Sequence, residues 1–215
     1  MKKLLFFSIL SSIVILSFGQ KTNLRKQENA NPQPPKEESI FRQFLFNASR
    51  TRINKDWSLM ADFRSGTNET VQFFPVQAID LKTNEKMNAL EIDMLIKPLQ
   101  TNILQSLGST LTITRTAWVG LEEIDDFIDF VEKFIVPNIK QKFKEKSSEY
   151  IFKSKELTFK FLVDEKGRRL TISINNYDFN EVTNSYFEFW TEAKVDNIDE
   201  LLPILKKVKS KNLEF

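Results

Sequence analysis

The sequence predicts an α+β fold made of two ββββα repeats with antiparallel sheets, each covered by one amphipathic helix. Three observations support this prediction. Apolar and polar residues alternate with a period of two in several segments, which is typical of strands with one buried face. Apolar residues recur every three or four positions in two other segments, which is typical of helices that cover a sheet. Residues 123–131 also match residues 197–205 after a shift of 74 positions, and each copy follows an aromatic-bearing strand.

The first 19 residues have the pattern of a signal peptide. Lys2 and Lys3 precede the apolar run 4–18, and small residues stand before a cleavage point after Gly19. This pattern predicts export to the periplasm or the extracellular space. An uncleaved membrane anchor is the alternative, but the run is shorter than the ~20 residues that a span needs. No later segment is an apolar run of this length, so we expect no transmembrane span after cleavage.

Residues 20–38 are polar and include a proline-rich stretch at residues 29–35. A chain of this composition does not bury enough apolar surface to offset its ordering entropy. We therefore predict a disordered linker over residues 20–38. A single folded domain is expected over residues 39–215, with the two repeats at about 55–140 and 148–212.

The first repeat is expected to contain four strands and a helix. Residues 40–46 precede it as a short helix or an edge strand. Its strands are predicted at the alternating segments 57–63, 71–78, 90–96 and 111–119. Within the second of these segments, Pro75 indicates an edge or a bulge. The helix is expected over residues 120–136, and Pro137 ends it.

The second repeat is expected to contain strands at residues 150–152, 157–163, 169–174 and 186–190. The second and third of these strands form the clearest hairpin of the chain, because Gly167 can adopt the positive φ of a tight turn. The closing helix is predicted over residues 198–208, with Asp196 as its N-cap. Pro203 lies inside this helix and predicts a kink or a restart.

Two segments carry a resemblance to known proteins. They are Trp118 to Phe127, with the sequence WVGLEEIDDF, and Val195 to Leu202, with the sequence VDNIDELL, which a basic tail follows. Over about residues 70–212, the chain resembles a group of small exported bacterial proteins of unknown function. Its ββββα duplication is similar in outline to the PUR and Whirly-type single-strand-binding repeats. The resemblance carries no catalytic residues, and a shared topology does not imply a shared function.

Several classes of chemistry are excluded by composition, since the chain contains no cysteine and no histidine. A Ser-His-Asp triad, a cysteine nucleophile and the usual haem, zinc and iron–sulfur sites all need an imidazole or a thiolate. No G-x-G-x-x-G or P-loop pattern occurs, so we expect no nucleotide cofactor. The leader holds 2 of the 31 basic residues and none of the 29 acidic ones, so the mature chain has a formal net charge of 0. It lacks the basic excess that is typical of nucleic-acid binding.

Acidic residues gather near the start of both predicted helices, and lysines follow both. The acidic run Glu122, Glu123, Asp125, Asp126 and Asp129 has the oxygen ligands that a hard cation prefers. The helix macrodipole also favours acidic residues at this position, and Asp199 and Glu200 repeat the placement. We therefore expect no metal site. The lysines, at positions 140 to 146 and 206 to 211, are read as a solvated face, with an acidic surface polymer as the alternative partner.

The candidate binding residues lie on strand faces that point away from the helices. If Phe187 and Phe189 point inward, their neighbours along the strand occupy the opposite face, and Trp118 does so in the first repeat. Aromatic rings beside carboxylates suit a sugar or a protein partner. The alternative is that the repeats pack or pair through this face, which would bury the tryptophans. The candidate partner-binding residues are Trp118, Tyr186, Glu188 and Trp190.

The sequence therefore predicts a non-catalytic, exported binding or interaction domain of the cell envelope. It would recognise a protein or carbohydrate partner through a sheet face, without a cofactor, and homodimerisation is one option. A carboxylate-dependent hydrolase is an alternative, since a glycosidase needs only two carboxylates at the right separation. Binding of single-stranded nucleic acid is a further alternative by fold analogy, although the neutral charge disfavours it.

Overall fold

The computed structural model describes residues 38–66, 69–96, 112–141, 143–174, 188–192, 195–211 and 213. All of them belong to one compact unit, residues 35–215. The predicted signal peptide, and the predicted linker up to residue 37, lie outside the described residues. Across the described ranges, every helix is too short or too polar to cross a membrane.

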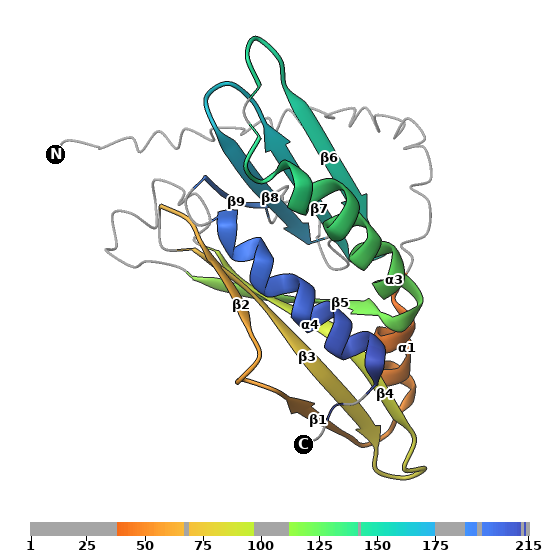
Figure 1. The fold of residues 1–215 in the computed structure, drawn as a ribbon. Coiled ribbons are helices and arrows are strands. Elements are labelled where there is room, and N and C mark those ends of the chain that lie inside the picture. Colours follow the sequence, from red (N-terminus) through yellow and green to blue (C-terminus); the bar gives the residue numbers. More distant parts are fainter. Residues whose placement is uncertain are drawn as a thin grey trace, which may run out of the picture. The chain divides into compact units, whose positions relative to one another are not determined.

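The described strands form two sheets in which every pairing is antiparallel (Figure 1). The strands are β1 (Thr51–Lys55), β2 (Ala61–Arg64), β3 (Thr70–Asp80), β4 (Lys86–Ile96), β5 (Ile113–Gly120), β6 (Ser148–Lys153), β7 (Leu157–Val163), β8 (Arg168–Ile174) and β9 (Glu188–Thr191). The first sheet has the order β1-β3-β4-β5, and β2 also pairs with β3. The second sheet has the order β6-β7-β8-β9.

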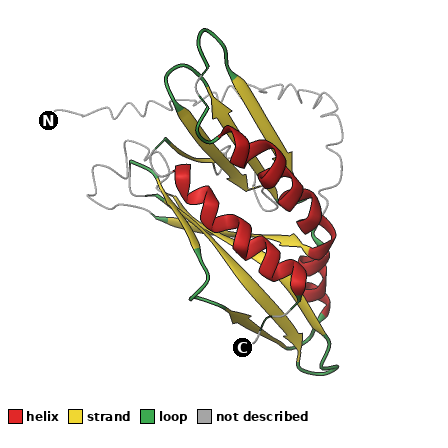
Figure 2. Cartoon of the chain, viewed as in Figure 1, coloured by secondary structure: helices red, strands yellow, loops and turns green. Residues whose placement is uncertain are grey.

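Helices complete the fold, so the predicted α+β class is confirmed (Figure 2). They are α1 (Ile40–Asn47), α3 (Leu121–Phe130) and α4 (Ile198–Ser210). A π-helical turn, η1 (Val131–Ile135), and a 3-10 turn, η2 (Val136–Asn138), continue α3. A further 3-10 turn, η3 (Val195–Asn197), leads into α4.

Each sheet is covered by the helix that follows the other sheet in the sequence. α4 packs on β2, β3 and β4 of the first sheet. α3 lies along the second sheet (Figure 1) and also contacts β4 and β5 of the first. Phe127 of α3 stacks on Phe152 of β6 with ring centroids 4.4 Å apart, and meets Phe159 of β7 edge-on at 5.4 Å. The two helices and the inner faces of both sheets therefore share one hydrophobic core.

α1 builds a second, smaller core on the opposite face of the first sheet. Ser39 is its N-cap, and the Ser39 hydroxyl accepts a hydrogen bond from the Arg42 amide at 3.1 Å. Phe41 is fully buried in this core, which also contains Phe74, Val76, Ala78 and Ala89. Residues 40–46, which the pattern left open between helix and strand, are therefore helical.

One predicted strand of the first half is wrong in its extent. Residues 57–63 were expected to be a single strand, but β2 begins only at Ala61 and residues 56–60 form a turn. The carboxylate of Asp56 stabilises this turn, since it accepts hydrogen bonds from the amide of Ser58 at 2.9 Å and from its hydroxyl at 2.6 Å. β1 ends immediately before the turn and was not expected.

Pro75 lies within a central strand and not at an edge or a bulge. β3 pairs with β4 along one side, and along the other side it pairs with β1 at residues 76–80 and with β2 at residues 70–73. Pro75 stands at the gap between these two partners, where its carbonyl accepts the Asp56 amide at 3.3 Å. Because the N and C=O of a strand residue point to the same side, the missing N–H of proline faces this gap.

The second half agrees more closely with the expectation. The predicted hairpin is present, and the carboxylate of Asp164 accepts the amides of Lys166 at 2.8 Å and Gly167 at 2.9 Å. Gly167 has a φ of 153°, as the turn requires. The helix α4 begins after Asn197 without a side-chain cap, so the prediction of Asp196 as N-cap is wrong. α4 also continues through Pro203 without a restart.

Candidate binding face on the first sheet

The outer face of the first sheet, opposite α4, brings aromatic and polar side chains together. Residues directly opposite in an antiparallel pair share one face, so the strand register arranges the side chains of this face in rows, among them three successive ones. The row beneath α1 is Phe74, Glu91 and Trp118. The next row is Asp62, Gln72, Asp93 and Thr116. The last row is Arg64, Thr70, Leu95 and Thr114. Among the described residues, no helix covers the last two rows.

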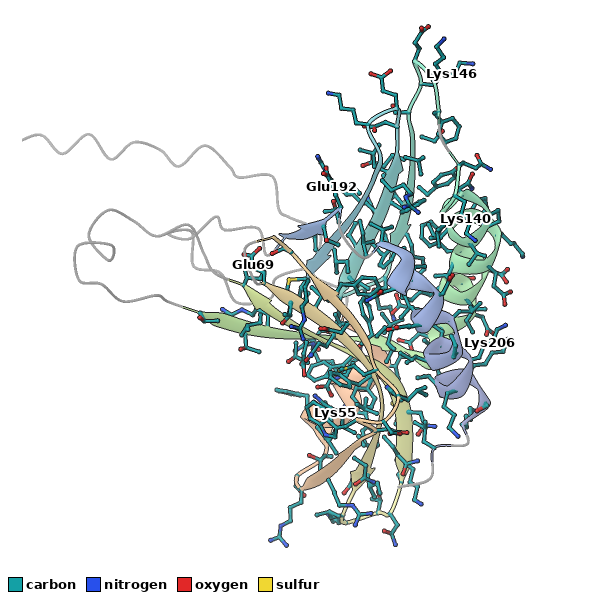
Figure 3. All side chains as sticks on the ribbon, turned by 60° about the vertical axis from the view of Figure 1, so that its left-hand side comes forward. Lys55, Glu69, Lys140, Lys146, Glu192 and Lys206 are labelled. Carbon is teal, nitrogen blue, oxygen red and sulfur yellow. The ribbon has the colours of Figure 1, made fainter. Side chains whose placement is uncertain are left out.

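Lys55 joins the first two rows through a compact ion-pair network, and Figure 3 shows its position on the first sheet. Its ammonium lies 2.5 Å from Oε1 of Glu91 and 2.7 Å from Oδ2 of Asp93. The hydroxyl of Thr116 donates to the other oxygen of Asp93 at 2.8 Å. The ammonium also lies 4.6 Å from the ring centroid of Phe74. Together these contacts hold the Lys55 side chain in place.

The network changes the proton affinity of its members. Burial disfavours the charged form of Lys55, but hydrogen bonds and charges from Asp93 and Glu91 outweigh this effect and raise the pKa of Lys55 above 10.5. Burial raises the pKa of Glu91 above 4.5, and the charge on Asp93 raises it further, against the opposing effect of Lys55. Glu91 is only 6% exposed, so its carboxylate depends on Lys55 to remain ionised.

We expect Lys55→Met to lower the free energy of unfolding by about 3 kcal/mol at pH 7, because it leaves the buried Glu91 carboxylate without its partner. In the wild type, the raised pKa of Lys55 means that its stabilisation is complete below pH 10.5 and is lost as the pH rises above that value. In the variant, Glu91 loses the lowering effect of Lys55 on its pKa and takes up a proton at a higher pH than in the wild type, so the deficit in the free energy of unfolding shrinks as the pH falls. Urea unfolding of both proteins at pH 5 and pH 7 measures this difference. Lys82→Met, at an exposed lysine of the β3–β4 turn, is the control, and an equal deficit at both pH values would contradict the assignment.

Trp57 extends the outer face beyond the sheet. It lies in the turn between β1 and β2, is 66% exposed, and meets Phe74 edge-on with ring centroids 4.8 Å apart. The Lys55 ammonium lies 5.1 Å from the Trp57 ring centroid. Trp57 therefore presents one open aromatic surface to solvent while Phe74 and Lys55 support it from the protein side.

The second row contains an unsatisfied acceptor. One carboxylate oxygen of Asp62 accepts the Arg64 guanidinium at 2.8 Å, whereas the other, Oδ1, is buried and has no hydrogen-bond partner among the described residues. Gln72 lies directly opposite Asp62 in the register and is partly exposed. A buried acceptor without a donor is unusual in a folded protein.

The predicted binding residues lie on two different sheets. Trp118 is on the outer face of the first sheet, as its alternation predicted, but it is half-buried against Phe41 of α1. Arg42 lies over its ring at 4.5 Å from the centroid. The indole N–H is buried without a hydrogen bond of ordinary geometry, although it is near enough to Glu91 to lower the pKa of that carboxyl.

The other predicted binding residues belong to or precede β9 of the second sheet. The backbone register pairs Trp190 with Thr171 and Glu188 with Ser173. Their side chains, and the whole of Tyr186, lie outside the part of the chain that the structure describes. The described site is therefore formed by Trp118 and by residues that the sequence did not single out, namely Lys55, Trp57, Asp62 and Gln72.

Glu156 anchors α1 to this face. It is fully buried, and its carboxylate accepts hydrogen bonds from the Ser39 amide at 3.1 Å and hydroxyl at 2.5 Å, and from the Arg42 guanidinium at 3.0 and 2.7 Å. It also accepts the backbone amide of Trp118 at 3.0 Å. One carboxylate in the turn between β6 and β7 thus connects α1 with the edge of β5.

The acidic residues at the start of α3 bind backbone groups nearby. Glu122 accepts the Ile40 amide at 2.8 Å, and Glu123 accepts the Lys155 amide at 2.8 Å. Burial raises the pKa of Glu123, to which the charges of Glu122 and Glu156 contribute. In the described part of the chain, no group of three or more acidic side chains is arranged to hold a metal ion.

Comparison of the chain with protein-family models, with curated proteins and with solved structures finds no significant match.

Proposed function

We propose that this protein is an exported, non-catalytic binding domain of the cell envelope that recognises carbohydrate through the outer face of the first sheet. The observation that carries the proposal is the polar row Asp62, Gln72, Asp93 and Thr116, which lies across four strands next to the exposed ring of Trp57. The row supplies the partly exposed amide of Gln72. Its carboxylates and hydroxyl already have protein partners, and they can contribute to a ligand only through their remaining lone pairs. Sugars present hydroxyl donors and acceptors together with apolar ring faces, so this combination is complementary to them.

The charge of the outer face favours a neutral ligand. The three rows contain one cation, Arg64, and Lys55 adds a second. The rows also contain three carboxylates, those of Asp62, Glu91 and Asp93. A face that binds a nucleic-acid strand needs a basic excess to neutralise phosphates. The near balance of charges therefore supports an uncharged sugar chain over single-stranded nucleic acid.

Binding also accounts for the carboxylates better than hydrolysis does. A glycosidase needs one carboxyl group as acid and a second as base or nucleophile, both facing the substrate. Here Glu91 and Asp93 both contact the ammonium of Lys55, and Thr116 occupies a further oxygen of Asp93. This arrangement holds the two carboxylates in an ion-pair network instead of leaving them free to transfer protons.

The proposal includes a duplicated ββββα architecture. The order β2-β3-β4-β5-α3 is followed along the chain by β6-β7-β8-β9-α4, and both sets of strands pair with their sequence neighbours. Because each helix packs on the sheet of the other half, the inner faces are filled and binding is left to outer faces.

The test is calorimetric titration of the purified chain with soluble neutral chito-, malto- and cello-oligosaccharides. We expect at least one series to bind, and Trp57→Ala to weaken that binding about tenfold, as loss of an aromatic contact does. Gln72→Ala should weaken it about fivefold by removing a hydrogen bond. Both substitutions are at exposed or partly exposed positions, so circular dichroism should remain unchanged.

Phe46→Ala is the matched control, because Phe46 is an aromatic residue that is 87% exposed on α1 and belongs to none of the polar rows. Absence of binding to every series, or equal affinity of wild type and Trp57→Ala, would contradict the proposal. Sedimentation of the same variants tests self-association: conversion of a dimer to a monomer by Trp57→Ala would make a second copy of the chain, and not carbohydrate, the occupant of this face.

A further inference from the structure

The segment that follows α3 exposes apolar side chains at a place separate from the proposed carbohydrate-binding face. Phe134 is 48% exposed and Val136 is 40% exposed, and Pro137 beside them is also exposed. The Phe134 ring packs in a tilted arrangement against Phe130 and Tyr150 of β6, with ring centroids 6.1 and 6.3 Å away. The exposed side of the Phe134 ring is therefore available for contact with a membrane surface or another molecule.

The backbone of this turn is irregular. α3 changes into the π-helical turn η1 at Val131 and then into the 3-10 turn η2 at Val136. π-helical turns are rare and are frequently found at functional sites. Ile135 and Ile139 of the same stretch are buried, so the turn is held firmly while Phe134 and Val136 face outward.

Lysines border the exposed apolar pair. Lys133 and Lys140 flank it, and Lys144 and Lys146 follow before β6 begins; all four are exposed. Figure 3 shows Lys140 at the end of the α3 segment and Lys146 at the tip of the turn that leads into β6. Residues 133–146 contain five lysines and one glutamate. The segment therefore remains positive even though Asp129 pairs with Lys133 at 2.6 Å.

We propose that the segment formed by residues 133–141 and 143–146 docks on the surface of an anionic lipid bilayer. Phe134 and Val136 would enter the boundary between headgroups and acyl chains, and the lysines would contact the headgroup phosphates. A positive segment with exposed apolar side chains matches such a surface in both charge and polarity. A soluble polyanion would satisfy the lysines alone and would leave Phe134 and Val136 in water.

The chain has no cysteine, so Val136→Cys introduces a single thiol for a nitroxide spin label while Phe134 is retained. The full chain is mixed with vesicles of phosphatidylcholine, or of equal parts phosphatidylglycerol and phosphatidylcholine, and the access of a water-soluble relaxing agent to the label is measured. We expect access to fall on the anionic vesicles and to remain high on the neutral ones. A label at Phe46→Cys, on the exposed side of α1, should stay accessible on both. This readout is local, so binding through the N-terminal apolar run does not affect it.

Charge reversal tests the role of the lysines. In the labelled Val136→Cys chain, Lys140→Glu with Lys144→Glu should weaken the protection by anionic vesicles about tenfold or more. Lys82→Glu in the β3–β4 turn with Lys86→Glu at the start of β4, both at exposed lysines, should leave it unchanged. A label at position 136 that stays accessible on anionic vesicles would overturn the proposal. Protection by soluble polyphosphate but not by vesicles would also overturn it and would identify a polyanion instead.

Discussion

Replacing Glu156 with alanine is expected to lower the free energy of unfolding by about 3 to 5 kcal/mol. The carboxylate is fully buried and accepts five hydrogen bonds, from Ser39, Arg42 and the Trp118 amide. Its removal leaves the backbone amides of Ser39 and Trp118 without their acceptor and takes the carboxylate partner away from Arg42. Breaking one side of a buried ion pair has a cost of this size. Urea unfolding followed by tryptophan fluorescence measures the change.

The same variant should release α1. We expect trypsin to cleave after Arg42 faster than in the wild type, because the helix loses the contact that holds its first turn. Glu156→Gln keeps one acceptor oxygen and should give an intermediate loss of stability. Glu165→Ala, at an exposed glutamate of the β7–β8 hairpin, is the matched control. Unchanged stability and unchanged cleavage in Glu156→Ala would show that the anchor is not formed.

Phe127→Ala is expected to lower the free energy of unfolding by about 3 to 5 kcal/mol as well. The ring is fully buried and lies between Phe152 and Phe159 at 4.4 and 5.4 Å between centroids. Its removal creates a cavity between α3 and the second sheet, and aromatic truncations of this kind have costs in this range. Thermal or urea unfolding provides the measurement.

Two comparisons make this prediction specific to the packing of α3. Phe127→Leu retains most of the volume and should cost about 1 kcal/mol, which gives a measurable protein if the alanine variant does not fold. Phe46→Ala, at an exposed ring of α1, should change stability by less than about 0.5 kcal/mol. Equal effects of the substitutions at positions 127 and 46 would contradict the contact between α3 and the second sheet.

Local chemistry explains which elements could be predicted from the sequence. The hairpin around Gly167 was predictable because its turn depends on neighbours alone, the Asp164 carboxylate and the positive φ of glycine. The alternation of residues 57–63 was misleading, since a turn can also place apolar residues two apart. Asp56 and Ser58, whose side chains hydrogen-bond within that turn, were the signal that could have identified it.

The site depended on contacts between residues far apart in the chain. Lys55 binds Asp93, which lies 38 positions later, and no local pattern relates the two. The alternation of residues 90–96 did place Glu91 and Asp93 on one face of a strand, but it did not reveal their partner. The apolar stripes of the two helices likewise predicted that each helix packs against an apolar surface, but they did not indicate which sheet provides that surface.

Because each helix packs on the sheet of the other half of the chain, the order of synthesis affects folding. A chain emerges from the ribosome N-terminus first, so the strands of the first sheet are complete while α4, near the C-terminus, is still missing. Until residues 198–210 are available, the inner side chains Val71, Phe73 and Ile92 lack the helix that buries them. The first half of the chain is therefore synthesised first but completes its native packing last. A nascent chain that stalls before α4 would expose the apolar inner face of the first sheet to other proteins.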